Sequence, residues 1–81
     1  MVTYYSIFIG GTSSPAGIAR RKIRGDGGIE DEMLRRSMSW EPDSLIAEWK
    51  RGDATEDLVE ISEQDARELV ERFRERWGQG T

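Results

Sequence analysis

The side chains on which most enzymes rely near neutral pH are missing from this sequence. Its 81 residues include no histidine and no cysteine. The chain therefore lacks the usual general base, the commonest nitrogen and sulfur ligands of metals, and the partners of most nucleophilic dyads and triads. Carboxylates, lysine and tyrosine are the groups that remain for catalysis. We predict a protein that is not an enzyme, with no catalytic residue, no cofactor and no metal site.

Two short segments have the composition of ligand-binding sites but lack the residue spacing that such sites require. The acidic run Glu30-Asp31-Glu32 lacks the alternating acids and the glycine of a calcium loop. The loop GGTSSP at residues 10–15 lacks the G-K-[ST] sequence of a phosphate-binding loop and runs into proline. A solvated acidic run and a flexible connection are the simpler interpretations.

A basic segment at residues 20–24 (RRKIR) is the first candidate for a binding surface. Alternate residues of a strand point to the same side, so Arg20, Lys22 and Arg24 would share one face. Such a face could contact phosphates, or it could be the solvated face of an edge strand. Nucleic acid is the alternative partner and not the first, because the net charge is −4 and RNA-reading sheets interleave aromatic with basic residues.

The three tryptophans are the second group of candidates. Trp77 falls on a helical apolar stripe and is expected in the core, where aromatic side chains supply much of the buried area. Trp40 and Trp49 flank a short predicted helix and could anchor a protein partner. The predicted partner-binding residues are therefore Arg20, Lys22, Arg24, Trp40 and Trp49.

The elements that position these residues begin with a hairpin. Residues 3–9 (TYYSIFI) are rich in β-branched and aromatic side chains, as strands are. Their apolar residues occupy both sets of alternate positions, which indicates an internal strand covered on both faces. Residues 17–24 predict the second strand of the hairpin, and GDGG at residues 25–28 predicts a turn.

Residues 29–36 allow two interpretations. A two-residue turn before them would place Lys22 opposite Asp31 and Arg21 opposite Glu32, and complementary pairs of this kind favour a third strand. Acids at the start and bases at the end of the same segment also suit a helix. We favour the strand.

A short helix is predicted to follow. The sequence W-E-P-D at residues 40–43 suits a helix start, because proline is tolerated in the first turn. The helix would cover residues 43–51, where Leu45, Ile46 and Trp49 lie on one face.

The packing of this short helix bears on oligomeric state. We expect it to cover the second face of the sheet, over Tyr4 and Phe8, with Trp49 partly exposed. An exposed apolar patch that included Trp49 would suit a partner or a symmetric dimer contact. After the helix, residues 58–61 predict another short strand.

The clearest predicted element is the closing helix. Ser62 and Asp65 have the spacing of a capping box, so the helix should start at residue 63. Its apolar residues recur every three or four positions: Ala66, Leu69, Val70, Phe73 and Trp77. Gly78 supplies a stop, and residues 79–81 form a predicted frayed tail.

Length and composition bound the fold class. The chain is long enough for one core, and 36% hydrophobic with 35% charged residues is a globular composition. No segment resembles a signal sequence or a membrane span. We predict one α+β domain at residues 1–78, in which a small antiparallel sheet of three to four strands is packed by a C-terminal amphipathic helix and a short second helix. We expect it in the cytoplasm, with no membrane partner.

Several of these segments resemble a set of short uncharacterised proteins of actinobacteria. The likeness rests on the aromatic opening strand, the basic second strand, W-E-P-D at residues 40–43, and S-E-x-x-A at residues 62–66. It covers most of the chain and implies a cytoplasmic setting in a high-GC bacterium. It implies no activity, cofactor or partner.

The prediction for function follows from these exclusions. We expect a small non-catalytic accessory or regulatory protein that acts through protein-protein contacts, with an unknown protein partner or as a homodimer. The alternative is a nucleic-acid-associated protein that uses the basic strand face.

Overall fold

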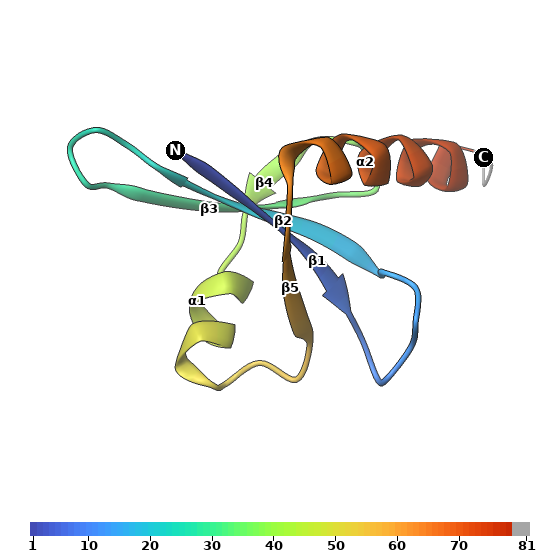
Figure 1. Cartoon of the computed structure of the whole chain (residues 1–81), viewed down its shortest axis with the longest axis horizontal. Helices are drawn as coiled ribbons and strands as arrows, with labels where there is room; N and C mark the ends of the chain where they lie inside the picture. The colour runs from blue at the N-terminus through green and yellow to red at the C-terminus, as the bar shows by residue number, and fades with distance from the viewer. Residues whose placement is uncertain (79–81) are drawn as a thin grey trace.

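Five strands and two helices are formed by residues 1–78, the part of the chain that the computed structural model describes; the predicted frayed tail at residues 79–81 lies outside the described residues. The elements follow one another in the order β1 (Val2–Phe8), β2 (Gly17–Ile23), β3 (Ile29–Leu34), β4 (Trp40–Pro42), α1 (Leu45–Arg51), β5 (Asp57–Ile61) and α2 (Glu63–Gly78) (Figure 1). The predicted α+β class is confirmed, but the sheet has five strands and not three to four.

All neighbouring strands of the sheet are antiparallel, in the order β4-β3-β2-β1-β5. β1 pairs with β2 on one side and β5 on the other, so its prediction as an internal strand is confirmed. β3 is a strand, which decides between the two interpretations of its segment. β2 lies between β1 and β3, so the interpretation of its basic face as part of an edge strand is wrong.

The extra strand, β4, lies where the sequence predicted the start of a helix. A tight turn after β3 is closed by hydrogen bonds from Arg35 N to Ser39 O (2.9 Å) and from Met38 N to Arg35 O (2.8 Å), and it returns the chain beside β3. Pro42 ends β4 at the edge of the sheet, where a missing N–H is tolerated. α1 therefore begins later, at Leu45, whose backbone N–H donates to Asp43 Oδ1 at 2.8 Å.

The loop between β2 and β3 changes the predicted register by one residue. Arg24 and Gly28 face each other, with Arg24 N donating to Gly28 O at 2.8 Å, so the loop has three residues and not two. Gly27 has a φ of +88°, as expected for the left-handed residue of a three-residue hairpin. Lys22 is consequently opposite Glu30 and not Asp31.

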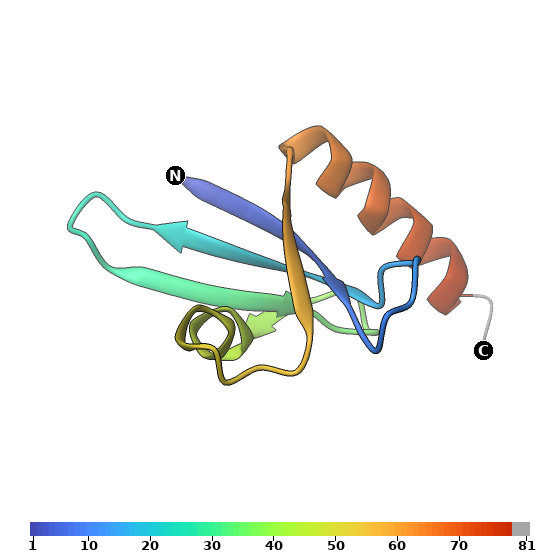
Figure 2. The same ribbon diagram turned by 60° about the horizontal axis from the view of Figure 1, so that its bottom comes forward.

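The two helices cover opposite faces of the sheet (Figures 1 and 2). α1 buries Leu45 and Ile46 against Tyr5 and Ile7 of β1. The expectation that α1 covers Tyr4 and Phe8 is therefore wrong, because it packs on the other alternating set of β1 residues. Tyr4 lies on the face that α2 covers.

The closing helix is confirmed in its start and its apolar stripe. Asp65 N donates to Ser62 Oγ at 3.1 Å, which caps the first turn. The stripe packs against Ile18 and Leu34 of the sheet. Phe73 is 1% exposed, and its ring stacks on that of Trp77 at a centroid distance of 4.6 Å. α2 therefore supplies much of the core on its side of the sheet.

Candidate functional site

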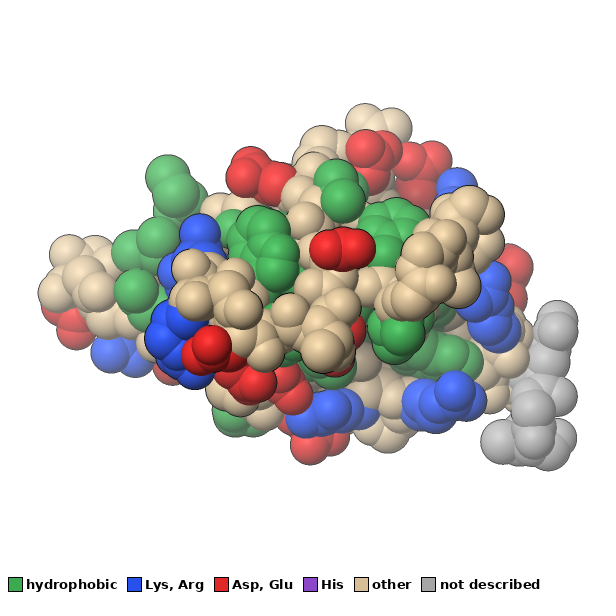
Figure 3. Space-filling model, turned by 90° about the horizontal axis from the view of Figure 1, so that it is seen from below, with side chains coloured by type: hydrophobic (Ala, Val, Ile, Leu, Met, Phe, Trp, Pro, Cys, Tyr) green, Lys and Arg blue, Asp and Glu red, His purple; other side chains and the backbone are tan. Residues whose placement is uncertain are grey.

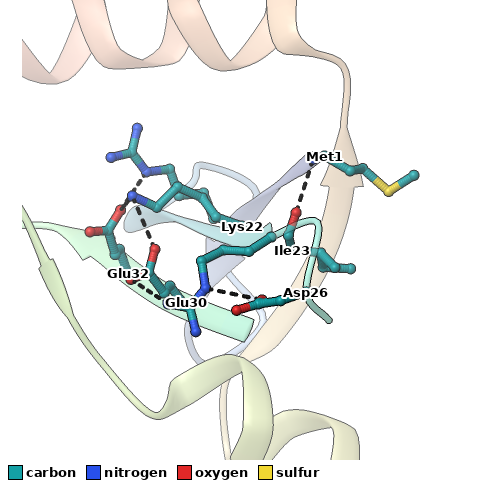
Figure 4. A network of polar contacts seen from close by, with 8 residues as sticks. Met1, Lys22, Ile23, Asp26, Glu30 and Glu32 are labelled. Carbon is teal, nitrogen blue, oxygen red and sulfur yellow. Dashed lines mark hydrogen bonds and ion pairs between the residues drawn. The ribbon is translucent and has the colours of Figure 1, made fainter. Parts of the chain in front are cut away.

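Arg20, Lys22 and Arg24 share one face of the hairpin formed by β2 and β3, and Glu30 and Glu32 of β3 pair with them there. Arg20 Nε lies 2.8 Å from Glu32 Oε1, and Lys22 Nζ lies 3.3 Å from the same oxygen. Arg24 pairs with Glu30 at 3.2 Å. Figure 4 shows this network, with Lys22 between Glu30 and Glu32. The three bases are therefore largely neutralised by their own sheet.

The acidic run is divided between the two faces of the sheet by the alternation of β3. Glu30 and Glu32 meet the bases described above, whereas Asp31 makes two hydrogen bonds to Arg21 on the α1 side, at 2.8 and 2.9 Å. Each carboxylate therefore has a basic partner. Within residues 1–78, no group of three acidic side chains is placed to hold a metal ion.

The ionised form of the Glu32 carboxyl is stabilised by its basic partners. The hydrogen bond from Arg20, followed by the charges of Arg20 and Lys22, lowers the pKa of the Glu32 carboxyl, and partial burial offsets this only in part. Glu32 therefore stays ionised at neutral pH and fixes the Arg20 side chain.

An aromatic pair lies beside this ion pair. The guanidinium carbon of Arg20 lies 4.1 Å from the centroid of the Trp40 ring, a cation–π contact. Tyr4 meets Trp40 edge to face, with ring centroids 6.2 Å apart. The sheet thus brings together Arg20 and Trp40, two of the predicted binding residues, and adds Tyr4 to them.

These side chains line one wall of a groove between the sheet and α2. The groove has a volume of about 310 Å³. The opposite wall comes from α2, whose Ala66 and Val70 are apolar and whose Arg67 and Glu71 are exposed and charged. The lining residues are Tyr4, Arg20, Trp40, Ala66, Arg67, Val70 and Glu71. This is our candidate site, which we call the aromatic groove.

Only Arg20 and Trp40 of this groove were predicted as binding residues from the sequence. Tyr4 was not predicted, because it is an ordinary residue of an aromatic strand. The α2 residues were not predicted either, because Arg67 and Glu71 are two of many charged positions on the helix. The spacing of Arg67 and Glu71 (i, i+4) with Val70 between them places all three on one flank of the stripe. Helical spacing alone could therefore have predicted this flank of α2. It could not have predicted that Tyr4, Arg20 and Trp40 lie opposite it.

Trp49, the fifth predicted residue, lies on the other side of the sheet. It is half-buried against the core under α1, and its ring lies 5.8 Å from that of Tyr5. The ammonium of Lys50 is 5.7 Å from the Trp49 ring. Lys22 and Arg24 lie farther along the hairpin and do not line the groove. The predicted residues therefore do not form a single surface.

Comparison with known proteins gives no further assignment. The chain matches no known protein family, no curated protein and no solved structure. The resemblance to actinobacterial proteins thus stays a prediction. None of the helices within residues 1–78 is long and apolar enough to cross a membrane.

Proposed function

We propose that this protein is a non-catalytic binding module whose aromatic groove receives an apolar side chain of a protein partner. The observation that carries the proposal is the joint presence of Tyr4, Trp40 and Arg20 at one partly exposed hollow. These three residue types are enriched at the energetic centres of protein interfaces.

The arrangement of the walls supports a peptide segment as the ligand. Tyr4, Trp40 and Val70 offer apolar surface inside the groove, and Arg67 and Glu71 offer charges of both signs at its rim. Such a site suits an apolar anchor flanked by polar residues, the usual plan of a protein interface.

The Arg20 wall is fixed before binding. Its guanidinium is held on one side by Glu32 and on the other by the Trp40 ring. Because these contacts already restrict the side chain, ordering it on binding costs little entropy. A preorganised wall of this kind favours selective recognition.

Selection from a random-peptide display library tests the proposal. Peptides that bind the wild type should share an apolar or aromatic anchor, and on titration they should shift the NMR signals of Tyr4, Trp40 and Val70. Trp40→Ala should weaken binding by about tenfold or more, as removal of a central interface residue does.

The controls lie on the other flank of α2. Glu68→Ala and Arg72→Ala remove exposed charges away from the groove and should leave binding unchanged, whereas Glu71→Ala and Arg67→Ala should alter it. Circular dichroism checks that each variant is folded. If no peptide is selected, or if the shifted signals surround Trp49 instead, the groove is not the binding site.

A nucleic-acid partner is the second candidate, because one observation favours it. Tyr4 and Trp40 share one sheet face with Arg20 and Lys22, and single-strand-binding sheets combine aromatic and basic residues in this way. The ion pairs to β3 weigh against it. Fluorescence anisotropy with a single-stranded oligonucleotide at low salt decides, since phosphate binding must weaken steeply as salt rises.

The cytoplasmic and bacterial setting is part of the same proposal. It rests on the resemblance described from the sequence. Fractionation of the host cells, followed by detection with an antibody to the purified protein, tests it.

A further inference from the structure

An apolar patch at the far end of the sheet is left uncovered by both helices. Ile23 and Ile29 are directly opposite each other on β2 and β3, and Met1 exchanges two backbone hydrogen bonds with Ile23. Residues opposite each other across antiparallel strands point to the same face. We call these three residues, Met1, Ile23 and Ile29, the hairpin patch; they are 85%, 38% and 54% exposed.

The patch is carried on a part of the sheet that projects. β5 pairs with β1 only from Tyr4 onward, and β4 pairs with β3 only from Glu32 onward. The end of the sheet around the β2–β3 loop is therefore three strands wide, and it extends beyond both helices (Figures 1 and 2). Seen from the α1 side, hydrophobic side chains emerge at that end, on the left in Figure 3.

The charges around the patch are paired within the hairpin. Between residues 21 and 31 the chain has three basic and three acidic side chains. Arg21 pairs with Asp31 at 2.8 Å, and the remaining bases pair with acids on the opposite face of the hairpin. Figure 4 shows the side chains of Met1 and Ile23 directed away from that opposite network. The hairpin thus has balanced side-chain charge, and the net charge of −4 belongs to the rest of the chain.

We propose that the hairpin patch binds the same patch of a second copy of this chain. A partner selected by charge would need an unpaired side-chain charge beside the patch, and the basic and acidic side chains there already pair with each other. The terminal ammonium of Met1 donates to Ile23 O at 3.1 Å. Two copies would repel each other through their acidic bodies. Contact through the projecting hairpins, whose side-chain charges balance, brings apolar surfaces together while those bodies stay apart, and a two-fold axis lets each patch cover the other.

The proposal makes a distinctive prediction for salt. Added salt screens the repulsion between two acidic bodies and does not weaken an apolar contact. Self-association should therefore strengthen as salt rises. A contact made by ion pairs would weaken instead.

Sedimentation equilibrium tests the proposal, with concentrations from about 10 µM to about 1 mM because small interfaces are weak. The wild type should pass from monomer to dimer over this range. The double variant Ile23→Thr/Ile29→Thr should remain monomeric, since threonine keeps the β-branched shape that strands favour but not the apolar surface. In a mixture of isotope-labelled and unlabelled protein, contacts between copies should involve the methyl groups of Ile23 and Ile29.

The matched control is Val59→Thr, at a strand position that is 50% exposed on β5. It should dimerise like the wild type, as should Trp49→Ala if that variant is folded. The proposal is overturned if the wild type is monomeric at every concentration, if the double variant still dimerises, or if Val59→Thr abolishes the dimer equally.

Discussion

Arg20 is held between two neighbours that come from different strands: its guanidinium carbon lies 4.1 Å from the centroid of Trp40, and its Nε donates to Glu32 at 2.8 Å. The cation–π contact and the ion pair share one charged group. The aromatic groove therefore depends on an acid of β3 that does not line it, and changes at Glu32 should be felt at the groove.

This dependence predicts an acid-side loss of stability. The pKa of Glu32 is lowered in the folded protein, chiefly by the hydrogen bond from Arg20, so its contribution is present above the ordinary value of 4.5 and is lost as pH falls through the lowered value. Glu32→Gln should be less stable than the wild type at neutral pH, and the difference should shrink as the solution is acidified. Urea unfolding at a series of pH values measures it; a difference that is independent of pH contradicts the assignment.

The stability of the protein at alkaline pH should depend on Tyr5. Burial, followed by the charge of Glu60, raises the pKa of the Tyr5 phenol. A raised pKa in the folded state means that stability is present below the ordinary value of 10.0 and is lost as pH rises through the raised value. Tyr5→Phe should flatten the fall in unfolding free energy above about pH 10. Equal slopes for the variant and the wild type would exclude Tyr5 as the cause.

The core on the α2 side should be sensitive to a single truncation. Phe73 is 1% exposed and stacks on Trp77, so Phe73→Ala removes a fully buried ring and should cost about 3–5 kcal/mol. That is a large part of the stability of a small domain. Arg74→Ala, on the exposed side of the same helix, should change stability by less than about 1 kcal/mol. Thermal unfolding of both variants checks the contrast, and an unchanged melting temperature for Phe73→Ala would show that the helix is not central to the core.

The backbone of the β2–β3 loop should require glycine at position 27. Gly27 has a φ of +88°, where a Cβ atom costs about 1–2 kcal/mol. Gly27→Ala should destabilise the protein by that amount. Gly25→Ala is the control, because a Cβ there meets nothing within 4 Å and its φ is not in the left-handed region. Equal effects of the two substitutions in chemical denaturation would contradict the three-residue loop.

Local patterns in the sequence predicted the closing helix and the first strand correctly. The cap at Ser62 and the stripe from Ala66 to Trp77 lie in one continuous segment of the chain, so their geometry depends only on the helical repeat. The alternation of β1 likewise predicted cover on both faces. The acid–base complementarity of β2 and β3 was also visible, although the register was not.

Features that depend on contacts between distant segments were determined only by the tertiary structure. Pro42 suits either a helix start or an edge strand, and only the return of the chain beside β3 made it a strand. One extra loop residue shifted the register by one, so that Glu30 is opposite Lys22, Asp31 is opposite Arg21 and Glu32 is opposite Arg20.

The two proposed surfaces could not be found from the sequence for the same reason. The aromatic groove joins Tyr4, Trp40 and Val70 from three separate segments, and no spacing along the chain records that they meet. The hairpin patch is exposed because β4 and β5 pair with only part of β3 and β1. Composition and periodicity determined which residues are apolar and which elements they form, but exposure depends on which neighbours the folded sheet and its helices supply.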